Sequence, residues 1–319
     1  MNRRRVTILL IVLVVIGAIV GIGAISRSTG SDTTASASTG AVTGAAVPSS
    51  LWYWTMAVSP TDPNALVVGT ANGLYRSTDG GKTWTPTGPK NFNATSVVQV
   101  GSSLYAGGAH ATPTTSPVVK TGATRAATSG AAVFAVSTDG GQTWKVQHPA
   151  GLPNAAVQAF AVDPANSQNF YAVLTSGKVY LSSNGAKSFK LSSPKIGIPP
   201  WAVAIMKGGQ FAGGDMDTGP YLSSNGTTWK KTTFTDSRGT KMVMEYAVAP
   251  TDTTKVLMTS FGIEVSTDSG KTWHTALKSS TMFGPIAYSA SKPDVAYAIG
   301  FDSSIWRSDD GGKSWTQVK

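Results

Sequence analysis

An all-β fold built from six similar four-stranded units is what the sequence predicts for the chain after residue 50. The first observation is composition: only 13% of the 319 residues are charged, while Gly, Thr and Trp are frequent, a profile typical of short strands and tight turns. The second is an octapeptide that recurs six times. The third is a set of alternating apolar stretches ahead of each copy, such as residues 65–69 and 73–76. Four strands in a repeat of about 42 residues indicate antiparallel propeller blades, so we expect a six-bladed β-propeller.

The N-terminus predicts a membrane segment. Residues 6–25 carry no charge, and residues 1–5 contain three consecutive arginines. A helix of twenty residues is about 30 Å long and spans one hydrocarbon core, and the arginines favour the cytoplasmic side. We therefore expect a cytoplasmic basic tail, a transmembrane signal anchor and a propeller outside the cytoplasm of a bacterial cell. A cleaved signal peptide, which would release a secreted protein, is the alternative.

Two low-complexity stretches accompany the repeats. Residues 26–50 are rich in Ser, Thr, Ala and Gly, and residues 109–131 have a similar composition. Such segments bury too little apolar surface to offset their chain entropy. We interpret residues 26–50 as a flexible linker and residues 109–131 as an insert within a propeller that spans residues 51–319.

The octapeptide defines the repeat. Four copies resemble STDGGKTW, and two are degenerate, SSNGAKSF and SSNGTTW. Their starts are separated by 60, 45, 41, 43 and 42 residues, and the insert accounts for the long first interval. The copies lie at residues 77–84, 137–144, 182–189, 223–229, 266–273 and 308–315.

Each octapeptide has the residues of a tight turn between two strands. Ser and Asp side chains cap backbone N–H groups, Gly accepts positive φ, and Trp is a large apolar anchor. We predict a structural role for these residues: Ser77, Asp79, Gly81, Trp84, Ser137, Asp139, Gly141, Trp144, Asn184, Asn225, Trp229, Asp268, Gly270, Trp273, Asp310, Gly312 and Trp315.

Each unit begins with its inner strand and ends with its outer strand, the last being residues 315–319. We therefore expect the ring to close by packing of the sixth unit against the first. Residues 46–52 are a candidate additional strand.

The octapeptides resemble the Asp-box, S-x-D-x-G-x-T-W, of the sialidase-like BNR-repeat propellers. Sortilin-type receptor domains, photosystem II assembly factors and exported bacterial proteins described as glycosyl hydrolase-like share this repeat. The resemblance implies the propeller fold over about residues 52–319 and a structural box distant from any ligand.

The resemblance does not extend to a sialidase site. Sialidases of this fold hold the substrate carboxylate with three convergent arginines, which supply a geometrically specific partner. Of four arginines after residue 50, Arg76 and Arg307 directly precede boxes and Arg125 lies in the insert. Only Arg238 remains for a central cleft, so we expect no sialidase activity.

Composition narrows the chemistry further. The chain has no Cys and three His, which excludes disulfides, thiolate metal sites and a cysteine nucleophile, and we expect no metal and no cofactor. The net charge of +10 would attract anionic polymers, but no nucleic-acid-binding motif accompanies it. We expect no nucleic-acid partner.

Candidate functional residues lie on the face opposite the boxes, where loops join the second and third strands and connect the blades. Loops on a rigid scaffold commonly carry function. Aromatic residues beside carboxylates suit sugar stacking and hydroxyl recognition. The candidate ligand-binding residues are Trp54, Trp201, Tyr246 and His110, and the candidate carboxylates are Glu245, Asp215, Asp217 and Asp302. The alternatives are core packing for Trp54 and Trp201, a polar turn for Asp215 and Asp217, and a solvated side chain for His110.

Glu245 differs most from its equivalents. Its equivalents at the same repeat position in other units are Thr55, Ala159 and Ala202. A carboxylate stands out among these residues because burying an unpaired carboxylate costs free energy. A structural ion pair with Lys241 or Arg238 is the alternative to a functional role.

Three functions remain open. The first is a membrane-anchored binding module that recognises a glycan, a cell-wall polymer or a protein. The second is a glycoside hydrolase in which Glu245 pairs with Asp215, Asp217 or Asp302. The third is an assembly scaffold like the photosystem II factors. We expect binding rather than catalysis.

Overall fold

The computed structural model describes residues 42–43, 53–110, 131–193, 196–198, 201–236 and 238–318. The expected basic tail, the membrane segment, most of the linker and residues 111–130 of the insert lie outside these ranges. No helix within the described ranges is both long and apolar enough to span a bilayer.

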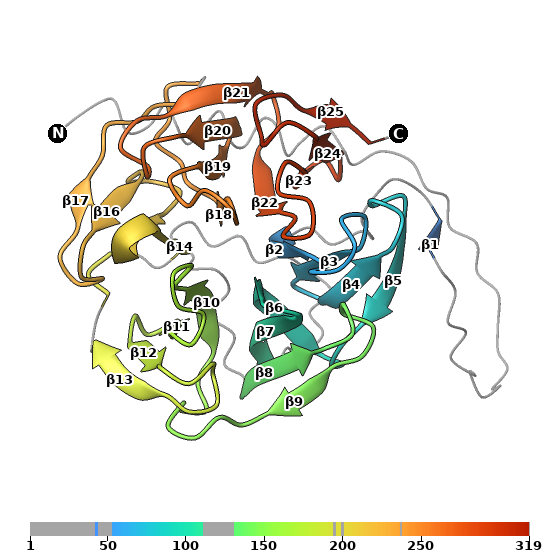
Figure 1. Ribbon diagram of the computed structural model, residues 1–319, viewed down its shortest axis with the longest axis vertical. Helices are drawn as coiled ribbons and strands as arrows, with labels where there is room; N and C mark the ends of the chain where they lie inside the picture. Colours follow the sequence, from blue (N-terminus) through green and yellow to red (C-terminus); the bar gives the residue numbers. More distant parts are fainter. Residues whose placement is uncertain are drawn as a thin grey trace, which may run out of the picture. The chain divides into compact units, whose positions relative to one another are not determined.

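Six antiparallel sheets surround a central axis (Figure 1), and each contains four strands that are consecutive in the sequence. Blades one to three comprise β2 (Tyr53–Val58), β3 (Leu66–Thr70), β4 (Gly73–Ser77), β5 (Thr83–Thr87); β6 (Phe92–Val100), β7 (Ser103–His110), β8 (Ala132–Ser137), β9 (Lys145–Gln147); and β10 (Val157–Val162), β11 (Phe170–Leu174), β12 (Val179–Ser182), β13 (Lys190–Ser193). Blades four to six comprise β14 (Ala202–Met206), β15 (Gln210–Gly214), β16 (Tyr221–Ser223), β17 (Lys230–Lys231); β18 (Tyr246–Val248), β19 (Val256–Ser260), β20 (Gly262–Ser266), β21 (His274–Lys278); and β22 (Phe283–Tyr288), β23 (Ala296–Gly300), β24 (Ile305–Ser308), β25 (Thr316–Gln317). A short 3-10 helix, Lys207–Gly209, joins β14 to β15. The predicted six-bladed, all-β architecture is confirmed.

The first strand of each blade lies innermost and is buried. All six residues of β2 and all six of β22 are buried, which is why these strands read as nearly continuous apolar runs rather than as alternating ones. Neighbouring inner strands run in the same direction, because Thr95 contacts Val157 while Ser96, next along the chain, contacts Phe160.

The Asp-box turns are organised by side-chain caps. In blade one the Ser77 hydroxyl accepts the Gly81 N–H at 2.8 Å and donates to Asp79 Oδ1 at 2.8 Å. Asp79 in turn accepts the Thr83 N–H at 2.9 Å and the Thr83 hydroxyl at 2.6 Å. The Trp84 indole N–H donates to the Gly81 carbonyl at 2.9 Å. The carboxylate therefore satisfies the N–H and hydroxyl donors of Thr83, where the turn meets the next strand.

The boxes share a face with the loops between first and second strands. Backbone N–H groups of the boxes donate to carbonyls of these loops, from Gly80 to Asn64 in blade one and from Gly311 to Asp294 in blade six. The loops between second and third strands lie at the other ends of those strands, on the opposite face.

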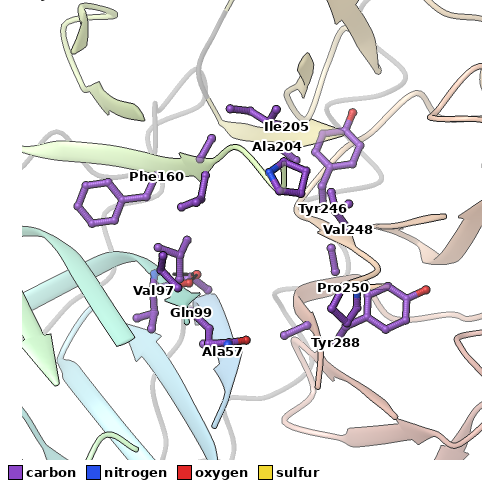
Figure 2. Close-up of a pocket in the computed structure, with 18 of the residues that line it drawn as sticks. Ala57, Val97, Gln99, Phe160, Ala204, Ile205, Tyr246, Val248, Pro250 and Tyr288 are labelled. Atoms are coloured by element: carbon purple, nitrogen blue, oxygen red, sulfur yellow. Dashed lines mark hydrogen bonds between the residues drawn. The ribbon is translucent and has the colours of Figure 1, made fainter. Parts of the chain in front are cut away.

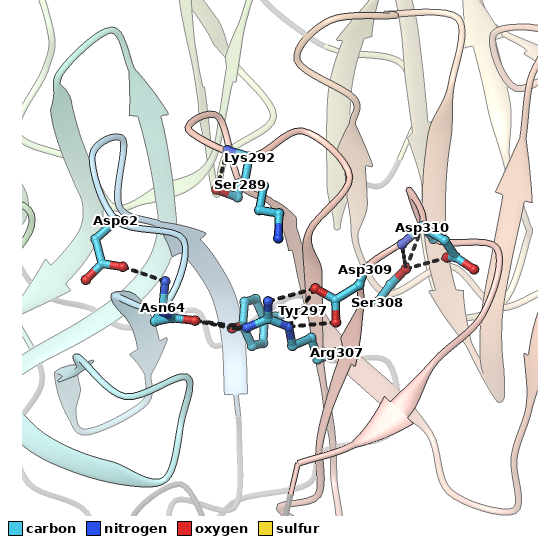
Figure 3. A network of polar contacts seen from close by, with 10 residues as sticks. Asp62, Asn64, Ser289, Lys292, Tyr297, Arg307, Ser308, Asp309 and Asp310 are labelled. Atoms are coloured by element: carbon cyan, nitrogen blue, oxygen red, sulfur yellow. Dashed lines mark hydrogen bonds and ion pairs between the residues drawn. The ribbon is translucent and has the colours of Figure 1, made fainter.

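The ring closes by side-chain packing between blades six and one. Ile305 and Tyr297 of blade six belong to one buried cluster with Met56 and Trp84 of blade one. A polar network flanks this cluster (Figure 3): Arg307 forms an ion pair with Asp309 at 2.7 Å and donates to Asn64 Oδ1 of blade one at 2.9 Å and to the Tyr297 hydroxyl at 2.7 Å. The expected closure by packing agrees with these contacts.

One additional strand adjoins the ring. β1 (Val42–Thr43) pairs antiparallel with β5, with Val42 opposite Trp84 and Thr43 opposite Thr83. It lies on the outer side of blade one in Figure 1. The candidate strand at residues 46–52 lies outside the described residues.

Candidate functional site

A cavity of about 380 Å³ occupies the centre of the ring. Figure 2 shows lining residues from several blades arranged around it, among them Val97, Ile205 and Val248. All six inner strands contribute to its lining, which extends to Pro164 and other residues of the loops between first and second strands. The lining therefore reaches the face that carries the boxes, whereas the sequence analysis expected the functional residues on the opposite face.

Apolar residues are the majority of the lining, but polar atoms supply about half of its exposed surface. Ala, Val, Ile, Phe and Pro recur among the lining residues, and no lysine or arginine of the described chain is among them. The polar residues of the lining are Thr55, Ser96, Gln99, Asp163, Ser167, Glu245, Tyr246 and Tyr288. A cavity with both polar and apolar surface can hold a ligand that has an apolar part and hydrogen-bonding groups.

Glu245 lines the cavity together with Thr55 and Ala159. It is half-buried, it directly precedes β18, and one of its carboxylate oxygens accepts the Tyr246 N–H at 3.3 Å. The repeat position that Glu245 shares with Thr55 and Ala159 therefore lies in the lining of the central cavity. The other glutamate, Glu264, is buried within β20 away from the cavity lining, and burial raises its pKa despite hydrogen bonding to Thr275.

Tyr246 is held in place by its surroundings. Its hydroxyl donates to the Gly213 carbonyl of blade four at 3.2 Å. Burial raises the pKa of Tyr246 strongly, and the negative charges of Glu245 and Asp215 raise it further. The phenol therefore stays protonated and joins blades four and five at the cavity wall.

The other candidate carboxylates cap turns away from the cavity lining. Asp215 is buried, and its Oδ1 accepts the N–H groups of Asp217 at 3.0 Å and Thr218 at 2.6 Å and also the Thr218 hydroxyl at 2.6 Å. Asp302 is exposed and accepts the Ser304 N–H and hydroxyl. Asp217 is exposed in the turn that Asp215 caps.

The two candidate tryptophans pack in the core and are not among the residues that line the cavity. Trp54 is 5% exposed and donates to Asn93 Oδ1 at 2.8 Å. Trp201 is 7% exposed and meets Trp54 edge to face, with ring centroids 6.3 Å apart. Phe234 and Val243 of the connection between blades four and five share their cluster. His110 is exposed at the end of β7.

The arginines do not form a clamp. Arg76 donates to the Gly140 carbonyl in the box of blade two, Arg307 belongs to the closure network, and Arg238 is exposed with its guanidinium over the Phe261 ring. Arg125 lies outside the described residues. Among the described residues there is also no cluster of three or more His, Cys, Asp or Glu that could hold a metal ion.

Several lining residues were not singled out from the sequence. Gln99, Asp163, Phe160 and Tyr288 lie near the carboxyl ends of inner strands. Asp163 also caps its loop by accepting the Ala165 N–H at 2.9 Å. The Asp163-Pro164 pair was visible as a turn signal, but the sequence alone does not show that this turn lines the central cavity.

The repeats match a known family. The sequence pattern of the BNR/Asp-box repeat matches residues 75–86 and 135–146. This chain is a six-bladed propeller that contains BNR/Asp-box repeats in its first two blades. No curated protein matches the chain.

Solved propellers are similar to this chain at low sequence identity. YCF48 bound to D1 peptide is 18% identical, with a TM-score of 0.48 over 87% of this chain and 83% of that one. YCF48 from Cyanidioschyzon merolae is also 18% identical, with a TM-score of 0.48 over 85% and 86% of the two chains. The GH74 enzyme of Niastella koreensis is 16% identical, with a TM-score of 0.37 over 83% of this BNR propeller and 49% of the enzyme.

Proposed function

We propose that this BNR propeller is an extracytoplasmic binding module, anchored in the membrane through residues 6–25, whose ligand is a segment of another protein. The ligand inserts an apolar side chain into the central cavity and donates a hydrogen bond from an amide or ammonium group to Glu245. The observation that carries this proposal is the central cavity, whose surface is shared by polar and apolar atoms and whose lining includes the half-buried Glu245.

We expect a peptide rather than a sugar, because a sugar ring stacks on exposed aromatic faces and the indoles of Trp54 and Trp201 are buried in packing. An aliphatic side chain gains free energy simply by leaving water, about 25 cal/mol for each Å² of apolar surface buried.

The carboxylates also disfavour glycoside hydrolysis. Glu245 and Asp163 are the carboxylates of the described lining. Glu245 lies directly before the inner strand of blade five, whereas Asp163 lies directly after the inner strand of blade three, which has six residues. Six residues of strand span about 20 Å, and a hydrolase pair requires about 5–9.5 Å. We therefore retain the hydrolase only as an alternative outcome of the test.

The experiment selects ligands for the full-length protein from a displayed library of random twelve-residue peptides. Affinities of the recovered peptides are then measured on three variants. Glu245→Gln removes the charge, and Ala204→Leu narrows the cavity at a half-buried lining residue. We expect each to weaken binding at least tenfold. Asp217→Asn, an exposed carboxylate outside the lining, is the matched control and is expected to bind normally.

Two outcomes would overturn the proposal. One is peptide binding that is equal on all three variants, which would place the ligand elsewhere. The other is the absence of selected peptides together with turnover of chromogenic glycosides that Glu245→Gln abolishes. Thermal unfolding of each variant verifies that lost binding does not reflect lost folding.

A further inference from the structure

The outer side of blades two and three carries an uneven distribution of charge. From residue 140 to residue 214 the sequence contains six lysines but a single acidic residue, Asp163. Asp163 lines the central cavity, so it lies on the inner side of its blade, away from the outer strands. Lysine directly follows the box aromatic in both blades, as Lys145 in β9 and as Lys190 in β13, and both side chains are exposed.

The box of blade three also lacks the usual negative charge. Its third residue is Asn184, where blades one, two, five and six have aspartate. The amide caps the turn much as a carboxylate does, because it accepts the Ser188 N–H at 3.0 Å and donates to the Ser188 hydroxyl at 2.8 Å. Lys187 in the same box is exposed, and this box holds no carboxylate to neutralise it.

Two exposed apolar side chains accompany these lysines. Val146 is 43% exposed and Leu191 is 53% exposed, and they are the exposed large hydrophobic residues of the described chain. Each directly follows one of the two lysines, at the same position of its outer strand. Single apolar residues on a surface are ordinary, but these two lie in neighbouring blades, within the stretch of chain that has a single acidic residue.

The connection between blades two and three holds the two outer strands in one surface. The Phe189 N–H donates to the Ala150 carbonyl at 2.7 Å. A Cβ added at Gly151 would collide with the Phe189 carbonyl oxygen, so the connection lies directly against the box of blade three. Val146 is four residues from Ala150 and Leu191 is two from Phe189. Since a chain spans at most about 3.6 Å per residue, both apolar residues lie close to this contact.

We infer that this surface, the basic rim formed by Lys145, Val146, Lys187, Lys190 and Leu191, docks on a bilayer that contains anionic lipids. Lysines are attracted to a negatively charged bilayer surface, and apolar side chains beside them enter its interfacial region. Successive side chains of a strand point to opposite faces, so a flat partner meets Lys190 and Leu191 together when it approaches the outer edge of β13. β9 lies on the outer side of the neighbouring blade (Figure 1), where the same surface can reach it. An acidic polymer without apolar groups would contact the lysines alone, which is why we favour lipid.

The basic rim is separate from the central cavity. None of its five residues lines that cavity. The inference therefore rests neither on the proposed peptide ligand nor on residues 6–25, and the two proposals can fail independently.

The test uses the full-length protein with one cysteine introduced for a polarity-sensitive fluorophore, because the chain has none. The label is placed at Gln147→Cys, exposed in β9, or at Thr316→Cys, exposed in β25 of blade six. Vesicles of phosphatidylcholine alone are compared with vesicles that also contain phosphatidylglycerol. We expect a blue shift at residue 147 with the anionic vesicles alone, reversed by high salt, and none at residue 316. Because the readout is local, attachment through another segment does not produce this pattern.

Two sets of lysine variants then test the charge. Lys145→Gln, Lys187→Gln and Lys190→Gln together remove three charges from the basic rim. They are expected to raise the concentration of anionic lipid that gives a half-maximal shift at least tenfold. The matched control removes three exposed box lysines of blades one, five and six and is expected to leave that concentration unchanged; its substitutions are Lys82→Gln, Lys271→Gln and Lys313→Gln.

A further variant tests the apolar contribution. Val146→Ser combined with Leu191→Ser keeps every charge and is expected to reduce the shift at residue 147. Equal shifts at residues 147 and 316, or equal responses of the two lysine sets, would overturn the inference. Binding of soluble polyglutamate without any shift on anionic vesicles would overturn it too and would identify an acidic polymer as the partner.

Discussion

The Asp-box aspartates act as ionised caps within the fold. Burial alone would raise the pKa of Asp139, but hydrogen bonds from the Thr143 hydroxyl and N–H, aided by Ser137 and Gln142, lower it to about 2. The pKa of Asp310 is lowered to about 2 in the same way. In blade three Asn184 fills the same role without charge, accepting the Ser188 N–H at 3.0 Å. The repeat therefore tolerates an amide where the carboxylate is usual.

Stability should fall in acid because these pKa values are depressed in the folded state. A depressed carboxyl stabilises the fold above its unfolded pKa near 4, and this contribution is lost as the pH falls toward 2. We expect Asp139→Asn to lower the free energy of unfolding by about 0.5–2 kcal/mol at pH 7. We expect the difference from the wild type to shrink between pH 4 and pH 2. Urea unfolding at several pH values measures both, and a constant difference would contradict the charged-cap account.

Individual strands show how closely the blades approach one another. Gly107 in β7 lies against the Phe160 ring of blade three, and a Cβ added at Gly107 would fall 2.5 Å from that ring. The neighbouring strand carries Phe160 into an aromatic cluster with Phe134 and Phe170. β7 therefore needs a residue without a side chain at this point of contact.

Gly107→Ala is expected to destabilise the protein by about 1–3 kcal/mol through overpacking. The cost should diminish when Phe160 is shortened to Leu, because the ring that the new methyl group meets is then absent. Denaturant unfolding of the two single variants and the double variant measures this coupling. Additive effects would show that the strain arises elsewhere than at Phe160.

At the scale of the whole molecule, the closing interface resembles the internal ones. Ile305 packs between blades six and one, and Ile263 holds the equivalent position in a cluster between blades five and six. Both side chains are almost fully buried. No strand is shared between blades six and one in the described chain, so packing and the Arg307 network join them.

Ile305→Ala is accordingly expected to cost about 2–5 kcal/mol, as is usual for a buried isoleucine truncated to alanine. Ile263→Ala, at the corresponding position of an internal interface, should cost a similar amount. Comparing the two free energies of unfolding tests whether closure is as strong as the rest of the ring. A markedly smaller effect of Ile305→Ala would identify a weak closure.

The repeat made the ring predictable from the sequence, and the site only partly so. The octapeptides set the number of blades, and alignment of the units placed Glu245 level with Thr55 and Ala159, all of which line the cavity. For Trp54 and Trp201 the sequence left both ligand binding and packing open, and the structure shows packing in a cluster with Phe234 and Val243. The sequence could not decide between the two because that packing depends on a long irregular segment without a repeat or strand period. A polar turn at Asp215 was also an open alternative, and its role as a turn cap agrees with it.

The assignment of each four-stranded sheet to one continuous stretch of chain has a consequence for circular permutation. Cutting the chain between two blades, for example between Lys278 and Phe283, severs no hydrogen-bonded ladder within a sheet. New termini at such a junction would leave all six blades intact and every blade contiguous. The pairing of β1 with β5 survives this cut as well, because both strands lie on the same side of it. The ring can therefore be opened for fusion to another protein at its blade junctions, with the cavity and the outer edge of blade one preserved.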